Sequence, residues 1–213
     1  MGKRCFIVGA GEFSKQWFPG DDDYVIAADA GYAQLVSVDI IPDLVVGDFD
    51  SLGAPPIHPN ILRSPAEKDD TDLMLAVKCG LERGFSSFII DGGLGGRLDQ
   101  TFANFQILTY LAEKDTFAVL LGREICVTAV RNGDICFSPG LGMKERLISV
   151  FSAGDKAVGV TLTGLKYPLD NATLTFDYPL GVSNEFTDAA AVVSVRSGTL
   201  LVIWSGGFDR LIF

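Results

Sequence analysis

The sequence predicts an α/β protein that continues into an all-β part. In the first 121 residues, short apolar runs alternate with segments in which apolar residues recur at helical spacing. This alternation predicts a mainly parallel sheet with helices on its faces. After about Gly122, strand-like runs are separated by turns and no helical segment is evident, which favours a sandwich or a barrel. We expect one domain over residues 1–125 and a second over residues 126–213.

The first domain is expected to contain strands and helices in alternation. The strands are the apolar runs Cys5–Val8, Tyr24–Ala28, Leu44–Val46, Ser87–Ile90 and Phe117–Leu121. The helices are expected over Ala30–Val38, Asp69–Arg83 and Leu98–Leu111, with Gly84 ending the second. In the third helix, the expected apolar face consists of Leu98, Phe102, Phe105, Leu108 and Leu111.

Two dipeptides in the second domain are typical of β-hairpin turns. Asn132-Gly133 separates the apolar runs Cys126–Val130 and Ile135–Phe137. Ser197-Gly198 separates Ala191–Arg196 from Thr199–Trp204 in the same way. A half-buried strand is expected at Val158, Val160 and Leu162, because these residues alternate with small or polar ones.

The charge balance limits the possible partners. Lys and Arg total 17 and Asp and Glu total 27, which gives a formal charge of −10. A chain this acidic, without a basic stripe, repels phosphate backbones, so we expect no nucleic-acid partner. A small phosphorylated ligand is compatible with this charge, because a metal ion can neutralise it locally.

The cysteines and the N-terminus indicate a cytoplasmic protein. The four cysteines form no Cys-x-x-Cys pair and match no zinc-ligand spacing. Cys5, Cys79 and Cys126 have apolar neighbours, so buried free thiols in a reducing compartment are expected. The apolar run before Gly9 is too short for a signal peptide or a membrane span, and we expect no membrane partner.

The first candidate segment for chemistry, Gly47–Ser51, directly follows the strand Leu44–Val46. Open α/β sheets bind ligands at the carboxyl ends of their strands. Asp48 and Asp50 are one residue apart and can hold Mg²⁺ together with water and substrate phosphates. An Asp-rich turn without a metal is the alternative.

The second candidate segment, Lys68–Asp72, lies at the start of a predicted helix. Acidic residues cap helix N-termini, and Asp69 with Asp72 resembles a capping box. A cap requires one or two such groups, whereas this segment has three carboxylates and a lysine. The excess indicates a charged ligand or a metal nearby.

The third candidate segment, Gly92–Gln100, connects a predicted strand to a predicted helix. Its glycines let the backbone approach a ligand, and Arg97 beside a helix N-terminus suits phosphate. A flexible connection with Asp99 as helix cap is the alternative. The only histidine, His58, lies in a proline-rich stretch, so carboxylates, metal and cations are expected to perform the chemistry, as in phosphoryl transfer.

These segments occur in an order that resembles the thiamine pyrophosphokinase family. The matching motifs are Ala28-Asp29-Ala30-Gly31, Pro42-Asp43, Gly47–Ser51, Lys68–Asp72, Gly96-Arg97-Leu98-Asp99 and Gly181-Val182-Ser183-Asn184-Glu185. Each motif is short, but their common order and spacing extend over nearly the whole chain. Ala30 departs from the glycine that is usual in the family, and Gln100 from a histidine common in bacterial members.

The resemblance implies a fold and an activity. The implied fold is a three-layer N-terminal α/β domain joined to a C-terminal β-sandwich. The implied reaction depends on Mg²⁺ and transfers the pyrophosphoryl group of ATP to the hydroxyl of thiamine, giving thiamine diphosphate and AMP. Thiamine, ATP and a second copy of the chain are the implied partners, because the family forms homodimers with sites between subunits.

The resemblance also implies residue roles in the catalytic centre. Asp48, Asp50 and Asp72 would hold magnesium. Asp99 would be a further carboxylate there, which either helps to bind metal or takes the proton of the thiamine hydroxyl. A carboxylate is a weak base for an alcohol, so metal polarisation and in-line placement would provide most of the effect.

Binding roles are implied in the same way. Lys68 and Arg97 would bind phosphate oxygens, with Asp29 and the backbone of Gly31 on the nucleotide side. Asp70 and Thr71 would face the substrate, and Ser183 and Asn184 would form hydrogen bonds with the aminopyrimidine of thiamine. Trp204 is expected in the core rather than against the thiazolium ring.

Two alternatives come from other functional classes. Asp48-Phe49-Asp50 has the spacing of the nucleophile and acid of a magnesium-dependent phosphohydrolase, although the glycine-rich segment would then have no role. A non-enzymatic protein that binds thiamine or a nucleotide would show binding without turnover and no magnesium requirement.

Overall fold

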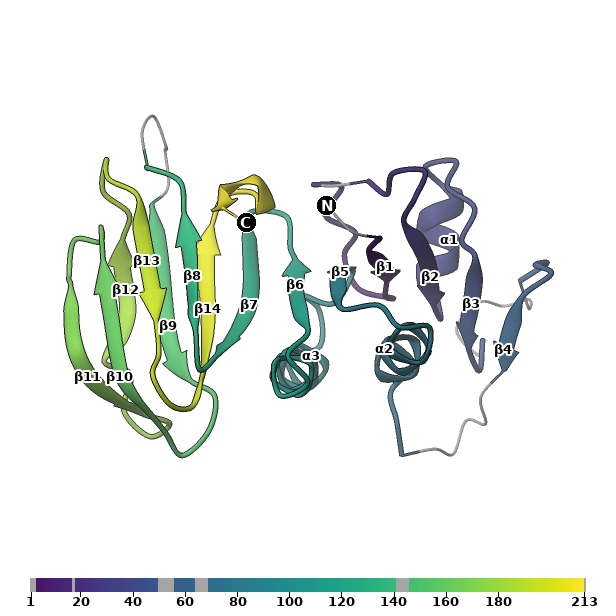
Figure 1. Ribbon diagram of the computed structural model, residues 1–213. Coiled ribbons are helices and arrows are strands. Elements are labelled where there is room, and N and C mark those ends of the chain that lie inside the picture. The colour runs from purple at the N-terminus through teal and green to yellow at the C-terminus, as the bar shows by residue number, and fades with distance from the viewer. Residues whose placement is uncertain (1–2, 17, 50–55, 64–68, 141–145, 213) are drawn as a thin grey trace. The chain divides into compact units, whose positions relative to one another are not determined.

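The computed structural model describes residues 3–16, 18–49, 56–63, 69–140 and 146–212 (Figure 1). Two predicted site residues, Asp50 and Lys68, lie outside these ranges. The chain forms two compact units. The first contains Met1–Ile107 and Thr116–Arg123, and the second contains Leu108–Asp115 and Glu124–Phe213.

The first unit is built on a parallel sheet. Its strands are β1 (Cys5–Val8), β2 (Tyr24–Ala28), β3 (Leu44–Gly47), β4 (Ile61–Arg63), β5 (Ser87–Asp91) and β6 (Phe117–Leu121). They lie in the order β6-β5-β1-β2-β3-β4, and each neighbouring pair is parallel. The short edge strand β4 has no counterpart in the sequence prediction, because its residues are largely exposed and lack an apolar run.

The strand order reverses direction at β1. The chain moves from β1 through β2 and β3 to β4 on one side, and β5 and β6 lie on the other side. Val8 at the end of β1 is opposite Asp91 at the end of β5, so both strands end at the same level. Such a switch point leaves a crevice outside the carboxyl ends of the two strands, where open α/β sheets bind ligands.

The three predicted helices are present with different bounds. They are α1 (Gly31–Val36), α2 (Asp72–Glu82) and α3 (Leu98–Ala112). The predicted cap at Asp69 is wrong, because α2 begins at Asp72 and Thr71 is its N-cap. The Thr71 hydroxyl accepts a hydrogen bond from the Met74 N–H at 3.2 Å, as expected of a capping threonine.

The predicted apolar face of α3 is also wrong in its first turns. The side chains of Leu98 and Phe102 are 82% and 53% exposed. The buried residues of this helix are Asn104, Ile107, Leu108, Leu111 and Ala112. At 100° per residue, Leu98 lies about 140° from Leu111 around the helix axis, so the predicted residues cover too wide an arc to be buried together.

The second unit contains two antiparallel sheets. One consists of β12 (Gly181–Glu185), β9 (Leu147–Ser152), β14 (Thr199–Ser205) and β7 (Ile125–Arg131), in that order. The other consists of β11 (Leu169–Thr175), β10 (Lys156–Thr163), β13 (Ala191–Ser194), β8 (Asp134–Phe137) and β15 (Leu211–Ile212). A 3₁₀ turn, η2 (Phe208–Arg210), precedes β15.

The two predicted hairpins are wrong, because each turn connects strands of different sheets. Asn132-Gly133 links β7 to β8, but β7 pairs with β14 and β8 pairs with β13. Ser197-Gly198 likewise links β13 to β14. The Asn132 side chain accepts a hydrogen bond from the Gly198 N–H at 2.9 Å, so the two turns hold each other. Turn residues specify a backbone bend but not which strands pair beyond it.

Aromatic residues fill the core between the two sheets. The ring of Phe137 on β8 lies 5.3 Å from Trp204 on β14 and 5.2 Å from Phe186. Trp204 is 1% exposed, and its indole N–H donates to the carbonyl of Gly207. The prediction that Trp204 is a core residue is confirmed. The expected strand at Val158–Leu162 is confirmed as part of β10.

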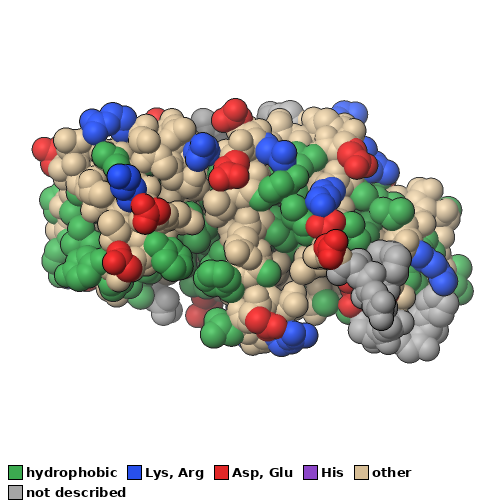
Figure 2. All heavy atoms as spheres, turned by 90° about the horizontal axis from the view of Figure 1, so that it is seen from below, with side chains coloured by type: hydrophobic (Ala, Val, Ile, Leu, Met, Phe, Trp, Pro, Cys, Tyr) green, Lys and Arg blue, Asp and Glu red, His purple; other side chains and the backbone are tan. Residues whose placement is uncertain are grey.

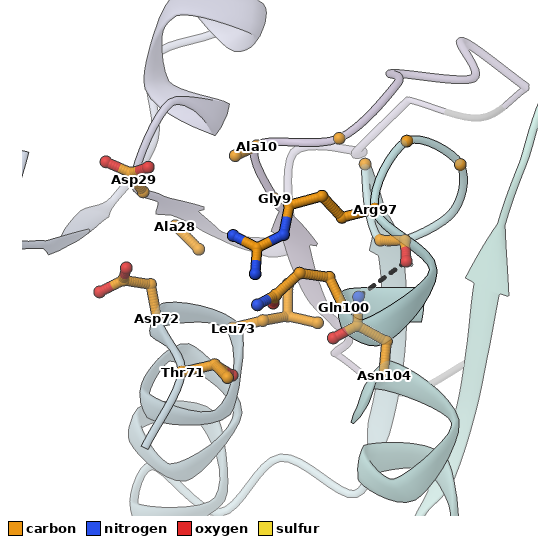
Figure 3. A pocket seen from close by; sticks show the side chains of 15 residues that line it. Gly9, Ala10, Ala28, Asp29, Thr71, Asp72, Leu73, Arg97, Gln100 and Asn104 are labelled. Atoms are coloured by element: carbon orange, nitrogen blue, oxygen red, sulfur yellow. Dashed lines mark hydrogen bonds between the residues drawn. The ribbon is translucent and has the colours of Figure 1, made fainter. Parts of the chain in front are cut away.

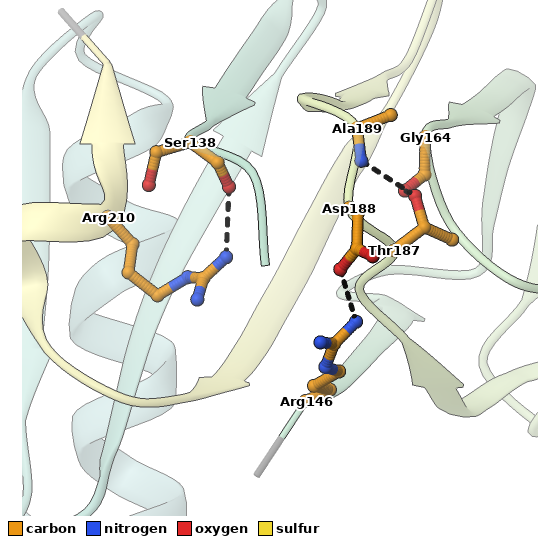
Figure 4. A network of polar contacts seen from close by, with 7 residues as sticks. All are labelled: Ser138, Arg146, Gly164, Thr187, Asp188, Ala189 and Arg210. Atoms are coloured by element: carbon orange, nitrogen blue, oxygen red, sulfur yellow. Dashed lines mark hydrogen bonds and ion pairs between the residues drawn. The ribbon is translucent and has the colours of Figure 1, made fainter. Parts of the chain in front are cut away.

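A buried arginine joins the loops at one end of this unit (Figure 4). Arg210 lies 4.1 Å from the ring centre of Phe186 and donates to the carbonyl of Ser138 at 2.9 Å. Burial lowers the pKa of Arg210 from its ordinary value. Nearby, Arg146 pairs with Asp188 at 2.8 Å. These contacts hold the segments around β8 and β13 together.

The fold class is confirmed: a mainly parallel α/β part is followed by an antiparallel β part. Cys5, Cys79 and Cys126 are buried free thiols, and Cys136 is half-buried. On the face shown in Figure 2, basic side chains alternate with acidic ones and form no continuous stripe. Across the part of the chain that the structure describes, no helix has the length and apolar character that a membrane crossing needs.

Candidate functional site

A cavity of about 490 Å³ lies at the switch point of the first unit (Figure 3). It is lined by Gly9, Ala10, Gly11, Ala28, Asp29, Thr71, Asp72, Leu73, Gly92, Gly93, Gly95, Gly96, Arg97, Gln100 and Asn104. Most of these residues end or follow β1, β2 and β5 or lie at the start of α2 and α3, and Asn104 lies one turn further along α3. The cavity is therefore the crevice that the strand order predicts.

Two glycine segments lie in contact on one side of the cavity. The Gly11 N–H donates to the carbonyl of Gly92 at 2.8 Å. A Cβ on Gly9 would lie 2.8 Å from the Gly92 carbonyl oxygen, and one on Gly92 would lie 2.5 Å from that of Gly9. Gly92 also has a φ of 67°, which disfavours other residues. Only glycines allow these two segments to approach so closely.

The first glycine segment, Gly9–Gly11, was missed by sequence reasoning, which identified only the second. Its signal was available: two glycines one residue apart directly after a predicted strand. Asn104 was also missed, because it lies within the apolar pattern of α3. Its buried side chain donates to the carbonyl of Gly93 at 2.7 Å and so holds the second glycine segment against the helix.

Arg97 supplies positive charge to the cavity. Figure 3 shows its guanidinium directed into the space between the glycine segments and Gln100. Arg97 also pairs with Asp99 at 2.6 Å, although both side chains are largely exposed. This hydrogen bond lowers the pKa of Asp99 and raises the pKa of Arg97. Asp99 is not part of the lining, whereas its neighbour Gln100 is.

Two acidic residues, Asp29 and Asp72, line the cavity on the side opposite Gln100 (Figure 3). Asp29 follows β2 with a φ of 50°, and its N–H donates to the carbonyl of Val46 on β3. Asp72 is the first residue of α2, and both Asp72 and its neighbour Thr71 line the cavity. The structure therefore brings together Asp29, Asp72, Thr71 and Arg97 from three separate predicted motifs.

Asp48 and Gly31 lie near the cavity but outside its lining. Asp48 follows β3, and a Cβ on the preceding Gly47 would lie 3.2 Å from the Cα of Asp29. The end of β3 therefore packs directly against the Asp29 backbone. Gly31 is buried, and a Cβ there would overlap the carbonyl of Val8, so this glycine is needed for α1 to pack on β1.

Asp70 has a partner of its own. Its carboxylate pairs with Lys78 on α2 at 2.6 Å, and it is not part of the cavity lining. This ion pair joins the segment before α2 to the second turn of the helix. Asp70 and Thr71, which the sequence placed together, therefore have different surroundings.

Ser183 and Asn184 belong to β12 in the second unit. The Asn184 side chain is 3% exposed; its oxygen accepts from the Tyr167 N–H at 2.9 Å and its amide donates to the Tyr167 carbonyl at 2.7 Å. Ser183 is exposed, has a φ of 57°, and lies where the pairing of β12 with β9 is irregular. Asn184 thus holds a neighbouring segment, and Ser183 is presented at the surface.

The donor chemistry of the cavity suits magnesium. Its described lining offers the carboxylate oxygens of Asp29 and Asp72 and no histidine or cysteine. Mg²⁺ is commonly bound by one or two carboxylates, with water and substrate phosphates as the remaining ligands. Among the residues within the described ranges, no three acidic, histidine or cysteine side chains form a complete metal centre. The residues fit an ion that binds together with a phosphorylated substrate.

Comparisons with known proteins agree with this geometry. Residues 19–120 match the family model "Thiamin pyrophosphokinase, catalytic domain", and residues 135–200 match "Thiamin pyrophosphokinase, vitamin B1 binding domain". A thiamine pyrophosphokinase of Bacillus subtilis is 33% identical over 195 residues, which cover 84% of this chain and 86% of the relative.

Solved structures give the same result. The crystal structure of thiamine pyrophosphokinase from Bacillus subtilis matches with a TM-score of 0.84 and 28% identity, covering 95% of this chain and 99% of that one. The enzyme structure from Geobacillus thermodenitrificans matches with a TM-score of 0.81 and 27% identity, covering 98% and 100% of the two chains. The order of the motifs, the glycine-lined cavity and these matches together show that the chain belongs to the thiamine pyrophosphokinase family.

Proposed function

We propose that this enzyme transfers the pyrophosphoryl group of ATP to the hydroxyl of thiamine. The thiamine oxygen forms a bond with the β-phosphorus, the bond from that phosphorus to the α-phosphate oxygen breaks, and AMP leaves. The hydroxyl proton is lost to solvent or to an acceptor in the site. The observation that carries this proposal is one cavity at the switch point with glycine backbone and Arg97 on one side and two carboxylates on the other.

In this proposal, the glycine segments and Arg97 bind the phosphate chain of ATP. The backbone of the four glycines in Gly92–Gly96 can come close to the ligand because glycine has no side chain, and α3 begins two residues after this segment. Arg97 provides two parallel donors for phosphate oxygens. Lys68, which lies outside the described residues, is proposed to add a second cation.

Asp72, Asp48 and Asp50 are proposed to hold Mg²⁺, with Asp29 on the nucleotide side. A bound magnesium ion would neutralise phosphate charge. Of the acidic residues, Asp29 and Asp72 lie on the side of the cavity opposite Gln100 and Asn104, so the phosphate charge would be neutralised on that side. Asp50 is outside the described residues, so its place in this set follows from the family motif alone.

Asp99 is proposed to orient Arg97 rather than to accept the proton of thiamine. Its hydrogen bond to Arg97 lowers its pKa, which makes the carboxylate a still weaker base for an alcohol. A paired guanidinium has fewer accessible rotamers, so it is held closer to the direction needed for phosphate. The sequence left both roles of Asp99 open, and the pairing favours this third one.

The second unit is proposed to recognise thiamine, as the description of the matched binding domain suggests. Ser183 is proposed to contact the ligand directly, because it is exposed at an irregular point of β12. Asn184 is proposed to act by holding the segment at Tyr167. Asp70 and Thr71 are proposed on the substrate side of the first unit.

The proposal also includes the domain boundary near residue 125, a homodimer with sites between subunits and a cytoplasmic location.

The test is a magnesium-dependent assay that follows all products by chromatography. We expect AMP and thiamine diphosphate in equal amounts, and neither product when thiamine or magnesium is omitted. ADP or free phosphate in place of AMP would contradict the proposal and favour the phosphohydrolase alternative. Family membership favours neither that alternative nor a non-enzymatic binding protein.

A further inference from the structure

The carboxylate of Asp91 joins the two loops whose glycines line the cavity. The backbone N–H of Ser14 donates to Oδ1 of Asp91 at 2.8 Å, and the Ser14 hydroxyl donates to Oδ2 at 2.6 Å. Oδ1 also accepts from the N–H of Gly92 at 2.6 Å. Ser14 belongs to the loop after β1, and Gly92 begins the loop after β5.

Two glutamines hold the same β1–β2 loop from other directions. The side chain of Gln34 on α1 donates to the carbonyls of Gly9 and Gly11. The side chain of Gln16 donates to the carbonyls of Gly122 and Arg123. Because the carbonyls of Gly9 and Gly11 accept these hydrogen bonds, the peptide planes of the first glycine segment have a fixed orientation.

Asp91 occupies a position where an apolar residue would be expected. It ends β5, in register with Val8, and is 0% exposed. Burial raises its pKa, although the hydrogen bonds from Ser14 and Gly92 act in the opposite direction. A buried carboxyl group costs free energy unless it is fully hydrogen-bonded, so its presence here calls for a compensating role.

We propose that Asp91 is a positioning residue for polyphosphate binding: through Ser14 and Gly92 it holds the two glycine segments at the spacing that accepts the phosphates of ATP. The inference rests on the proposed function, because it takes ATP as the occupant of the cavity. Asp91 is not part of the lining and acts through the backbone that it holds. The Ser14 loop precedes residue 19, where the catalytic family match begins.

Ser14 offers the sharper test, because it is half-buried and its hydroxyl can be removed with little risk to folding. We expect Ser14→Ala to raise the Kd for magnesium-ATP about fivefold, as the loss of one charge-assisted hydrogen bond would. The conservative Ser14→Thr keeps the hydroxyl and is expected to restore binding. Isothermal calorimetry with magnesium-ATP and no thiamine measures both, since no turnover is needed.

Asp91→Asn is the second variant, and Asp22→Asn is its matched control, an exposed aspartate of the same loop. We expect Asp91→Asn to weaken ATP binding at least as much as Ser14→Ala, with the KM for thiamine within about twofold of the original enzyme. The control is expected to leave both constants unchanged.

Several outcomes would overturn the inference. The first is that Ser14→Ala binds magnesium-ATP as tightly as the original enzyme does. The second is that Ser14→Ala and Ser14→Thr weaken this binding equally. The third is that Asp91→Asn raises the KM values for ATP and for thiamine equally. A failure of the proposed function looks different, because the original enzyme would then bind magnesium-ATP without forming AMP from thiamine and ATP. The binding comparison among variants would still decide the role of Asp91 in that case.

Discussion

Among the described residues that line the cavity, Arg97 is the only one with a positively charged side chain. We expect Arg97→Gln to raise the KM for ATP and to lower kcat/KM about a hundredfold, because a charge-assisted contact to phosphate is lost. Arg97→Lys retains the charge but not the paired donors, so an intermediate loss is expected. Steady-state kinetics with varied ATP measure this, with the exposed Arg131→Gln in the second unit as control. A normal KM for ATP in Arg97→Gln would contradict the proposed phosphate contact.

Asp99 allows its two possible roles to be separated. If Asp99 orients Arg97, Asp99→Asn should raise the KM for ATP about three- to tenfold and change kcat little. If it accepts the thiamine proton, kcat should fall by a factor of about a hundred or more and the KM for ATP should stay constant. The 2.6 Å ion pair favours the first outcome. Asp39→Asn, another exposed aspartate of the first unit, is the matched control.

Sequence reasoning was most successful for residues that follow predicted strands or begin predicted helices. Asp29, Asp72, Thr71 and Arg97 were predicted, and the structure places them around one cavity. Asn104 was missed because it lies within the apolar pattern of α3, and Asp91 was missed because its partner Ser14 is 77 residues away in the sequence. A motif shows which residues can perform chemistry, but not which ones hold the backbone around them.

At the scale of elements, the two glycine segments after β1 and β5 make a direct prediction. A Cβ at Gly92 would lie 2.5 Å from the Gly9 carbonyl oxygen, whereas a Cβ at Gly84 would meet nothing within 4 Å. Both glycines have positive φ, so alanine is strained at both positions. We expect Gly84→Ala to cost about 1 kcal/mol of unfolding free energy, the cost of the backbone conformation alone.

Gly92→Ala is expected to cost clearly more, because the two loops must also separate. Urea denaturation of both variants measures the difference, and magnesium-ATP binding should weaken only in Gly92→Ala. Equal destabilisation by the two substitutions would show that the loops have room to move apart, which would contradict the close approach of the glycine segments.

Element boundaries and pairings were predicted less well than element types. Short apolar runs identified β1, β2, β5 and β6, and helical spacing identified the existence of all three helices. They failed where the pattern has more than one physical solution, as at the start of α3, where apolar residues occupy more than one face. They also failed at Asn132-Gly133, because the same turn chemistry suits a hairpin and a crossing between two sheets.

At the scale of the whole molecule, each unit has its own buried core, and each unit contains two of the four cysteines. Cys5 and Cys79 lie in the first unit and Cys126 and Cys136 in the second. Burial is the main cause that raises the pKa of Cys5 and of Cys79 above the ordinary value. Because the thiolate is the reactive form, a raised pKa and burial both slow reaction with a thiol reagent.

The native protein should therefore react with Ellman's reagent at the half-buried Cys136 first, and the denatured protein at all four cysteines. Raising the pH to about 9, where ordinary thiols ionise, should leave Cys5 unreactive, since burial raises its pKa well above that of an ordinary thiol. Cys136→Ser should remove the fast phase. Rapid labelling of Cys5 in the native protein at neutral pH would instead mean that β1, the central strand beside the cavity, is open to solvent, and the close contacts of Gly9 with Gly92 could not then persist.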